Sequence, residues 1–335
     1  MSLAQIDCVA KPREPVWLEA VKNTPVHGSI YIIRYFPLNL VSMSEVAPTT
    51  RLNSGYNIPL LALGTYGSSK DRARMRETVN WAIEAGYRHI DTAALYDNER
   101  QIGEGLADVI EKGLVKRENL FITTKLWNDR HARNQVVPAL KESLDKLKLD
   151  YVDLYLIHSP EAEKADGSPA DIDYIETWKG MEECKKLGLA RSIGVSNFNT
   201  DQIDRIIASS DVPPAVNQIE VHPSLTQEEA VFDCQIRNIT VMAYSPFGFL
   251  VSREGVEKMP PPKADDPQLV EIAKKYGKST NQVVLRYLID RYLIPVPKST
   301  NKKRIAENID VFDFRLTDED INTINKFNSN SSIFE

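Results

Sequence analysis

From residue 60 onward the sequence alternates short apolar runs with segments of helical periodicity. Such an alternation is typical of parallel sheets, because each pair of parallel neighbours needs a crossover of about a dozen residues, usually a helix. Eight strands of this kind close on themselves once, so we predict an α/β fold of the (β/α)8 TIM barrel class. The eight predicted strands are residues 60–63, 87–90, 120–123, 152–157, 190–195, 215–219, 240–243 and 293–296.

Helical spacing fills the intervals between these runs. Apolar residues recur on one face of residues 72–85, and Gly86 follows where a C-cap glycine is expected. The same spacing recurs in residues 136–147 and 269–273. A further helix over residues 283–287 comes just after the seventh crossover, so we expect extra helices in the C-terminal part of the chain.

The rival fold is a doubly wound open sheet, which usually carries a glycine-rich turn directly after its first strand. This sequence has no such turn after residues 60–63. A near-match, GEGLAD at residues 103–108, lies inside the helical stretch 100–114 and not after a strand. We therefore interpret these glycines as part of a helix and not as a cofactor loop.

A hairpin signal precedes the first barrel strand. Residues 50–52 and 56–58 flank Asn53-Ser54-Gly55, a turn sequence typical of β-hairpins. We expect this N-terminal β-hairpin to close the bottom of the barrel.

Residues 1–45 match none of the periodicity that follows. We leave this N-terminal extension unassigned, with disorder as one alternative and with Met43 as an alternative start of the folded unit. Residues 46–335 then form a single barrel domain. A domain of this length buries about three quarters of its unfolded surface, so it needs no disulfides.

The composition argues against several classes of protein. Apolar residues make up 42% and charged residues 26% of the chain, as in ordinary globular proteins, and the net charge of −6 argues against nucleic-acid binding. No apolar run reaches the ~18 residues of a membrane span. Cys8, Cys184 and Cys234 are odd in number and lack metal-ligand spacing, which suits a reducing compartment. We expect a cytoplasmic monomer that binds neither nucleic acid nor membrane.

Four reactive side chains follow three successive predicted strands, at the end where barrel enzymes carry out catalysis. Asp91 follows the second strand, with Tyr96 five residues later, while Lys125 follows the third strand and His158 the fourth. Each alone could be structural, as an ion pair, a packing tyrosine or a core histidine. Burying all four without partners would cost several kcal/mol, so we interpret them as a catalytic tetrad.

These residue types suit the reduction of a carbonyl group by hydride. The developing alkoxide needs a proton, and a free tyrosine, with a pKa near ~10, is a poor acid at neutral pH. We expect the ammonium of Lys125 to lower the pKa of Tyr96, with Asp91 holding the lysine charged. His158 would donate a hydrogen bond to the carbonyl oxygen and orient it.

The sequence resembles the aldo-keto reductase family from Thr49 to Phe327. The resemblance rests on GYRHIDTAALYDNE (86–99), TTKLW (123–127), LIHSP (156–160), IGVSNF (193–198), NQIEVHP (217–223), AYSPFG (243–248) and IPVPKSTNKKRIAEN (294–308). It implies that Tyr96 is the proton donor, that Asp91 and Lys125 tune its acidity, and that His158 orients the substrate. A histidine at position 158, where some relatives that reduce C=C bonds carry glutamate, favours C=O reduction.

The resemblance also implies NADPH as the cofactor. It assigns binding of the nicotinamide carboxamide to Ser196, Asn197 and Gln218, and stacking on the ring to Tyr244. The remaining implied positions are Ser245 and Phe247 along the pyrophosphate, Lys298, Ser299, Thr300 and Arg304 at the adenosine 2′-phosphate, and Glu307 and Asn308 at the adenine. Cationic groups beside a predicted helix N-terminus form an anion site, which favours NADPH.

Under this interpretation the substrate is a small-molecule carbonyl compound. By resemblance, Tyr66, Trp127 and Phe249 line an apolar pocket. The tail after Phe327 is short and polar, and an open pocket could accept bulky ketones. Insect reductases of 3-dehydroecdysteroids are similar overall, which makes a steroid-type ketone such as 3-dehydroecdysone one candidate.

Two other functions are compatible with a barrel of this kind. One is an NADPH-binding barrel with a regulatory or structural role and little turnover, against which the intact tetrad argues. The other is a metal-dependent hydrolase, which needs several histidine or acidic residues at strand ends. Only His158 and His222 are available, without an HxH pair, so we expect no metal.

Overall fold

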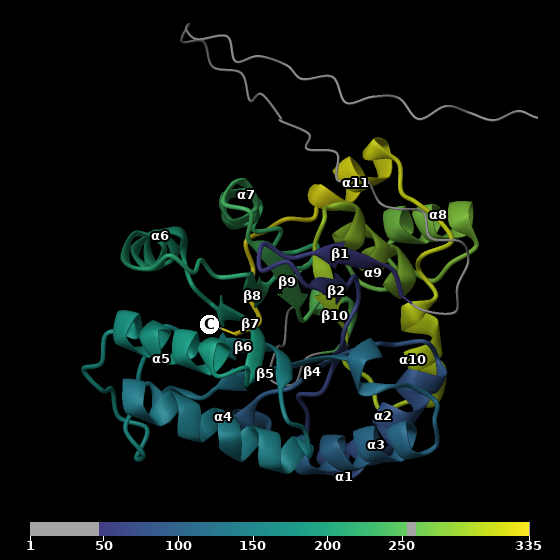
Figure 1. Ribbon diagram of the computed structural model, residues 1–335. Helices are drawn as coiled ribbons and strands as arrows, with labels where there is room; N and C mark the ends of the chain where they lie inside the picture. The colour runs from purple at the N-terminus through teal and green to yellow at the C-terminus, as the bar shows by residue number, and fades with distance from the viewer. Residues whose placement is uncertain (1–46, 253–258, 335) are drawn as a thin grey trace, which may run out of the picture. The chain divides into compact units, whose positions relative to one another are not determined.

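Figure 1 shows the computed structural model, which describes residues 47–252 and 259–334. The predicted N-terminal extension, residues 1–45, lies outside the described residues. Its separation from a single barrel domain over residues 46–335 therefore stays a prediction.

Eight parallel strands follow one another around the sheet in sequence order, from β3 to β10. Because each strand pairs with the next along the chain, the carboxyl ends of all eight lie at one end of the sheet. The strands are β3 (Leu63–Gly64), β4 (His89–Asp91), β5 (Phe121–Leu126), β6 (Val152–Ile157), β7 (Ala190–Ser196), β8 (Val216–Glu220), β9 (Thr240–Tyr244) and β10 (Ile294–Val296).

The first and last strands meet and close the barrel. The amide of Ala62 donates to the carbonyl oxygen of Pro295 over 3.1 Å, and the amide of Gly64 donates to that of Pro297 over 3.0 Å. Prolines have no N–H to donate in return, so this seam is short. For this reason β3 begins only at Leu63, near the end of the predicted strand 60–63. The predicted (β/α)8 barrel is confirmed.

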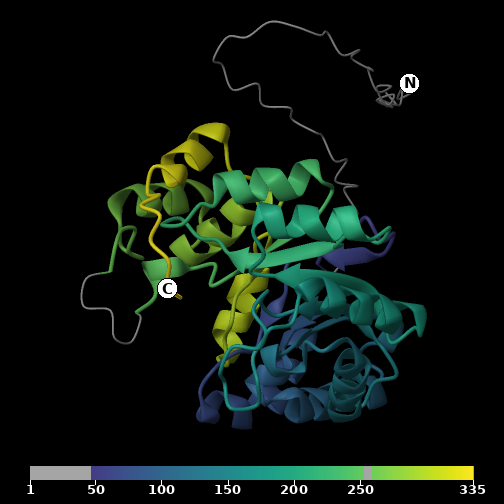
Figure 2. The same ribbon diagram turned by 90° about the vertical axis from the view of Figure 1, so that its left-hand side faces the viewer.

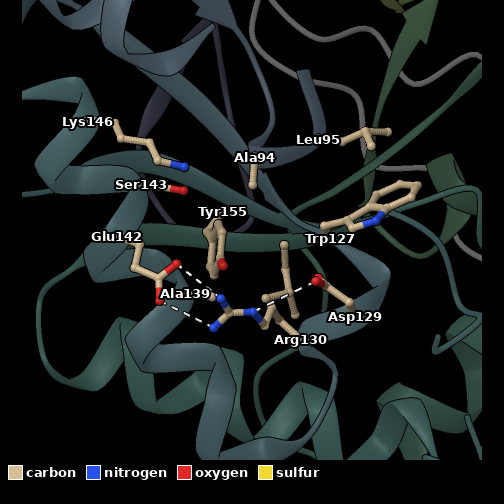
Figure 3. A pocket seen from close by; sticks show the side chains of 11 residues that line it. Ala94, Leu95, Trp127, Asp129, Arg130, Ala139, Glu142, Ser143, Lys146 and Tyr155 are labelled. Carbon is tan, nitrogen blue, oxygen red and sulfur yellow. Dashed lines mark hydrogen bonds and ion pairs between the residues drawn. The ribbon is translucent and has the colours of Figure 1, made fainter. Parts of the chain in front are cut away.

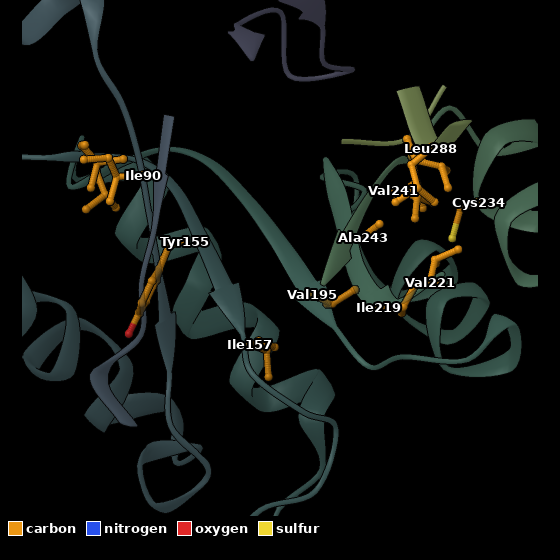
Figure 4. Close-up of a cluster of buried hydrophobic side chains, with 14 of the residues drawn as sticks. Ile90, Tyr155, Ile157, Val195, Ile219, Val221, Cys234, Val241, Ala243 and Leu288 are labelled. Atoms are coloured by element: carbon orange, nitrogen blue, oxygen red, sulfur yellow. The ribbon is translucent and has the colours of Figure 1, made fainter. Parts of the chain in front are cut away.

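The helices lie around the outside of the strands (Figure 1 and Figure 2). Aliphatic side chains of both layers, among them Ile157, Val241 and Leu288, form the main core between them (Figure 4). The helices are α1 (Ser69–Ala73), α2 (Met75–Glu84), α3 (Glu99–Glu111), α4 (Arg133–Leu147), α5 (Tyr174–Lys186), α6 (Thr200–Ser209), α7 (Glu228–Ile236), α8 (Pro267–Tyr276), α9 (Thr280–Asp290), α10 (Lys302–Ile309) and α11 (Asp318–Asn325). Short 3-10 helices are η1 (Ala94–Tyr96), η2 (Arg117–Asn119), η3 (Asn128–Arg130) and η4 (Gly248–Leu250).

The predicted helix over residues 72–85 is in fact two helices, α1 and α2, and this boundary was wrong. A capping box between Ser68 and Asp71 starts α1 earlier than the apolar pattern indicates. Arg74, with φ of −99° and ψ of 0°, then ends α1 and begins α2. Apolar periodicity does not report α1, because none of the α1 residues is buried, whereas the buried side chains of this stretch belong to α2.

The glycines of the GEGLAD stretch lie in α3 and serve helix packing. A Cβ atom on Gly103 would lie 2.5 Å from the carbonyl oxygen of Lys146, and one on Gly105 would lie 2.8 Å from that of Arg76. Only glycine permits these close approaches to neighbouring helices. The interpretation of this stretch as a helix is confirmed.

The hairpin of β1 (Thr49–Arg51) and β2 (Asn57–Pro59) closes the amino-terminal end of the barrel. Leu52 and Ile58 are buried in one cluster with side chains from the barrel strands. The Asn53 side-chain amide donates to the carbonyl oxygens of Pro214 and Asn238, just before β8 and β9, over 2.8 and 3.1 Å. The hairpin therefore lies away from the opposite, carboxyl end of the barrel, where we expect the active site. Within the described part of the chain, no helix is long and apolar enough to cross a membrane.

Candidate active site

The barrel brings the four predicted catalytic residues to its carboxyl end. Asp91 is the last residue of β4, Tyr96 the last of η1, and Lys125 the fifth residue of β5. His158 directly follows β6. Register along the three neighbouring parallel strands therefore places these side chains on one face of the molecule.

Lys125 is the centre of the site. Its side chain is buried, and Nζ lies 2.6 Å from Asp91 Oδ1, 2.9 Å from the carbonyl oxygen of Thr92 and 3.3 Å from Tyr96 Oη. An ammonium group has three protons, and these three acceptors use all of them. Burial alone would lower the pKa of Lys125, but its interactions and hydrogen bonds with Asp91 and Tyr96 raise that pKa overall. The lysine therefore stays charged.

Tyr96 keeps its proton more firmly than the sequence predicted. Burial raises its pKa, and the charge of Lys125 offsets only part of that effect. The expected action of Lys125 is present, but desolvation of the phenolate is the larger effect. At neutral pH Tyr96 is a protonated phenol held next to an ammonium group.

His158 packs edge-on against two aromatic rings, at 5.7 Å from the Tyr96 ring and 5.1 Å from the Trp127 ring. Burial, and to a smaller extent the charge of Lys125, lowers the pKa of His158 to about 3. The imidazole is therefore neutral at physiological pH. Its Nδ1 atom is buried and has no hydrogen-bond partner among the described residues.

A second group of predicted residues continues around the same end of the barrel. Gln218 Nε2 donates to Asp91 Oδ2 over 2.7 Å, and Ser196 Oγ donates to the carbonyl oxygen of Gln218 over 2.8 Å. Tyr244 Oη donates to Asn197 Oδ1 over 3.0 Å. Asn197 has a φ of 63°, a left-handed conformation that asparagine adopts more readily than most residues. The predicted carboxamide and stacking residues thus adjoin the tetrad.

Ser245 and Phe247 come next, between β9 and η4. Ser245 has a φ of 48°, which turns the chain away at the end of the strand. Phe247 is half-buried and packs against the core. The structure places both beyond Tyr244, as the resemblance implies, and their role along a pyrophosphate stays a prediction.

The predicted phosphate group is gathered around the start of α10. Lys298 Nζ lies 2.8 Å from Asp71 Oδ2, and Thr300 Oγ1 donates to Asp71 Oδ1 over 2.9 Å. Asn301 caps the helix by accepting from the amide of Arg304 over 3.1 Å. The side chain of Arg304 is exposed and makes no ion pair with the described residues. A free guanidinium beside a capped helix N-terminus is suited to an anion.

Asp71 is a member of this group that the sequence did not reveal. Burial opposes ionisation, but hydrogen bonds from Lys298, Ser68 and Thr300 lower the pKa of Asp71 to about 2. It therefore remains a carboxylate that orients Lys298. Its capping-box spacing after Ser68 was the available signal, although that spacing predicts a helix start and not a site.

The last three predicted cofactor residues lie on or before α10. Ser299 and Asn308 are buried, and Glu307 Oε1 accepts from Ser279 Oγ over 2.6 Å. These contacts hold α10 against the start of α9. The assignment of Glu307 and Asn308 to adenine stays a prediction.

The predicted substrate residues are only partly brought together. The Tyr66 ring lies 5.1 Å from the Tyr96 ring and is 58% exposed, and Trp127 contacts His158. Phe249 is buried instead against His222, with 5.7 Å between the ring centres. Tyr66 and Trp127 thus border the tetrad, while the structure turns Phe249 toward a neighbouring cluster.

A cavity of about 170 Å³ lies on the outer side of Trp127, between β5, η1 and α4 (Figure 3). Arg130 crosses it and pairs with Glu142 over 3.3 Å, and the Tyr155 side chain lines it from β6. None of the four tetrad residues lines this cavity. The cavity therefore lies beside the tetrad and shares only Trp127 with the predicted site residues. Among the described residues, no group of three or more histidine, cysteine or acidic side chains could hold a metal ion.

Comparisons with known proteins agree with this geometry. Residues 60–329 match the Aldo/keto reductase family. Aldo-keto reductase AKR2E4 of Bombyx mori is 60% identical over 297 residues, which are 88% of this chain and 96% of that protein. Its crystal structure in complex with NADP has a TM-score of 0.85 and covers 87% of this chain and 95% of that chain.

Two further relatives are more distant. The crystal structure of aldo-keto reductase AKR2E5 of Bombyx mori, complexed with NADPH, is 43% identical, has a TM-score of 0.83 and covers 85% of this chain and 89% of that chain. Aldo-keto reductase family 1 member A1 of Gallus gallus is 41% identical over 302 residues, 86% of this chain and 91% of that protein. The chain therefore belongs to the aldo/keto reductase family and is an oxidoreductase.

Proposed function

We propose that this protein is an NADPH-dependent carbonyl reductase that converts aldehydes or ketones to alcohols, with Tyr96 as the proton donor. The observation that carries the proposal is the three-way contact of buried Lys125 Nζ with Asp91, the Thr92 carbonyl and Tyr96 Oη. A purely structural ion pair does not need a phenol as its third acceptor. The neutral His158 beside the phenol supplies the second polar group that a carbonyl oxygen requires.

The residues fit a bound NADPH. Asn197, Gln218 and Ser196 lie next to the tetrad, and Tyr244 stands at the neighbouring strand end. Lys298 and the exposed Arg304 fit an additional phosphate, which NADH lacks. The bound cofactors of the two silkworm relatives support this assignment.

The chain's own residues account for the proton. A bound NADPH would supply the hydride to the carbonyl carbon. Tyr96 Oη would give its proton to the carbonyl oxygen, which leaves an alcohol and a phenolate. Lys125 Nζ, at 3.3 Å, stabilises that phenolate, and Asp91 keeps the lysine in place. His158 holds the carbonyl oxygen near Oη by a neutral hydrogen bond, and solvent then returns a proton to Tyr96.

The substrate class extends to bulky ketones, of which 3-dehydroecdysone is the one to test first. The exposed ring of Tyr66 and the edge of Trp127 form an apolar rim beside the phenol. We also propose that the protein works as a cytoplasmic monomer.

The proposal is tested by following NADPH absorbance with a panel of aldehydes, diketones and 3-ketosteroids, with NADH in parallel. Replacing Tyr96→Phe removes the proton and should lower kcat by about 10²- to 10⁴-fold. The matched control is Tyr56→Phe, an exposed tyrosine on the hairpin at the opposite end of the barrel. NADPH binding without oxidation by any carbonyl would instead favour the regulatory barrel.

A further inference from the structure

The cavity beside Trp127 is lined by both apolar and polar side chains (Figure 3). The apolar side chains come from η1, from the end of β5 and from α4, and they are Ala94, Leu95, Leu126, Trp127 and Ala139. The volume of about 170 Å³ is roughly ten times the 10–15 Å³ that a single water molecule needs. The cavity is therefore large enough for a small organic molecule.

The phenol of Tyr155 lines this cavity without a hydrogen-bond partner. Tyr155 is 1% exposed, and none of the described residues forms a hydrogen bond with its Oη atom. Burial raises the pKa of Tyr155 well above its usual value, so the group stays a neutral phenol that can donate. A buried hydroxyl group without a partner is rare, because it costs free energy. An oxygen atom of a ligand would supply the missing acceptor.

Lys146 gives the cavity an ammonium group whose protons are not used by the described residues. Its Nζ atom lies 3.9 Å from Glu99 Oε2, which is beyond hydrogen-bond distance. Glu99 Oε1 accepts instead from Thr124 Oγ1 over 2.7 Å, and Oε2 has no hydrogen-bond partner in the described part of the chain. The Lys146 side chain is 41% exposed, so a ligand that enters from solvent can reach its protons.

The other charged side chains at the cavity pair with one another. Both terminal nitrogens of Arg130 donate to the carboxylate of Glu142 over 3.3 Å, and Arg130 Nε lies 4.0 Å from Asp129 Oδ2. Arg130 thus interacts with both acidic side chains among the described lining residues. Lys146 is the cation that remains for a ligand, so the cavity favours an anion.

Trp127 connects the cavity to the predicted active site. Its indole ring lines the cavity and also packs edge-on against His158, with 5.1 Å between the ring centres. Leu95, on the same side of the cavity, directly precedes Tyr96 in η1. A molecule in the cavity would therefore contact the neighbours of two tetrad residues without occupying the space between Tyr96 and His158.

We propose that this cavity is a second ligand site, which binds a small carboxylate with an apolar body of about the size of one aromatic ring. Lys146 binds the carboxylate, Tyr155 donates a hydrogen bond to a ligand oxygen, and the apolar side chains surround the body. A charged acceptor fits two donors better than a neutral one does, because hydrogen bonds to charged groups are the stronger ones. The site goes beyond the proposed carbonyl reduction, since none of the tetrad residues lines it.

Benzoate is the probe for this site, and benzamide is its uncharged analogue. Each is titrated into the full chain with NADP bound, and the readout is the methyl NMR signal of Ala139, which lines the cavity from α4. This signal should shift and saturate with benzoate, and the Kd for benzamide should be about tenfold higher or more. A signal that does not move with benzoate would overturn the site, and equal Kd values for the two probes would overturn its preference for carboxylates.

Lys146→Met and Tyr155→Phe test the two donors. The matched control is Lys141→Met, because Lys141 is an exposed lysine on α4 that does not line the cavity. The Kd of benzoate measured at Ala139 should rise about tenfold or more in Lys146→Met and about fivefold in Tyr155→Phe, which keeps the buried ring. It should stay at the wild-type value in Lys141→Met. Equal Kd values in Lys146→Met and Lys141→Met would contradict the proposal.

Tyr96→Phe separates this site from the predicted active site. The Kd of benzoate measured at Ala139 should be the same in Tyr96→Phe as in the wild-type protein, because Tyr96 does not line the cavity. A rise as large as that in Lys146→Met would place benzoate beside the tetrad and rule out a second site. If no carbonyl drives NADPH oxidation, the reductase function is wrong, while the titrations at Ala139 still decide whether the cavity binds a carboxylate.

Discussion

At the scale of single residues, the site depends on how buried charges are paired. Lys125 and Asp91 are both almost fully buried, which is costly unless every proton and lone pair finds a partner. Lys125 gives its three protons to oxygen atoms, and Asp91 accepts from Lys125 and Gln218. This complete pairing fixes the ammonium beside Tyr96. In the proposed reaction, this geometry favours transfer of the Tyr96 proton only when negative charge develops on the substrate oxygen beside it.

The pH profile of carbonyl reduction follows from these residues. In the proposed reaction Tyr96 is an acid that is active below its pKa, and burial raises that pKa above the usual ~10. The pKa of His158 is lowered to about 3, so the imidazole is already neutral above about pH 4. We expect kcat/KM to be flat between pH 5 and pH 9, and to fall only at higher pH. A limb with an apparent pKa near 6.5 that disappears in His158→Gln would contradict this assignment.

At the scale of elements, the residues proposed to choose the cofactor gather at the start of α10, apart from the four tetrad residues. Its cap at Asn301 and the neighbouring Lys298 orient the amino end of the helix, while Arg304 projects into solvent from the first turn. Asp71, on α1, forms an ion pair with Lys298 and fixes the position of its ammonium group. The residues proposed to bind the extra phosphate therefore lie on or beside two elements, neither of which carries a tetrad residue.

Replacing Arg304→Ala should weaken NADPH binding by about 10- to 100-fold, because a hydrogen bond to a charged group contributes about 1.5–3 kcal/mol. Binding of NADH, which lacks the 2′-phosphate, should change little. Fluorescence titration with both cofactors measures the two constants. The control is Arg133→Ala, an exposed arginine at the start of α4. Equal losses for NADPH and NADH would place Arg304 outside the 2′-phosphate site.

At the scale of the whole molecule, the hairpin and the catalytic end are on opposite sides of the strands. Leu52 and Ile58 share a cluster with interior residues of the barrel, such as Met242 and Val296. The amides of Ala62 and Gly64 complete the ring by donating to the carbonyl oxygens of two prolines. The buried hairpin residues and the predicted catalytic residues thus lie at opposite ends of one barrel.

Truncating Ile58→Ala should lower the free energy of unfolding by about 2–5 kcal/mol, because Ile58 is fully buried and a cavity would remain. The kcat/KM at 25 °C should stay near the wild-type value, since the change lies at the far end of the barrel. Denaturant unfolding measures the first quantity and NADPH absorbance the second. Thr49→Ala, at an exposed position of the same hairpin, should cost less than about 0.5 kcal/mol. Comparable losses in the two variants would show that the hairpin does not stabilise the barrel through its buried side chains.

The sequence by itself determined the barrel and most of the site. Strand periodicity located β6 within its observed bounds, and reading only the strand ends located Asp91, Tyr96, Lys125 and His158. These features are local, because hydrophobic spacing and strand order are written along the chain and parallel strands put their carboxyl ends together. The predicted phosphate residues near α10 lie within seven residues of one another, and their role at the 2′-phosphate stays a prediction.

Only the tertiary structure decided the rest. It brought Asp71 to Thr300 across 229 positions of sequence and Glu220 to Ile333 across 113, and no local pattern encodes such contacts. It turned Phe249 toward His222 and divided the predicted helix over residues 72–85. It also made the pKa of Tyr96 rise instead of fall. Desolvation depends on everything packed around a group, and those neighbours are known only once the chain has folded.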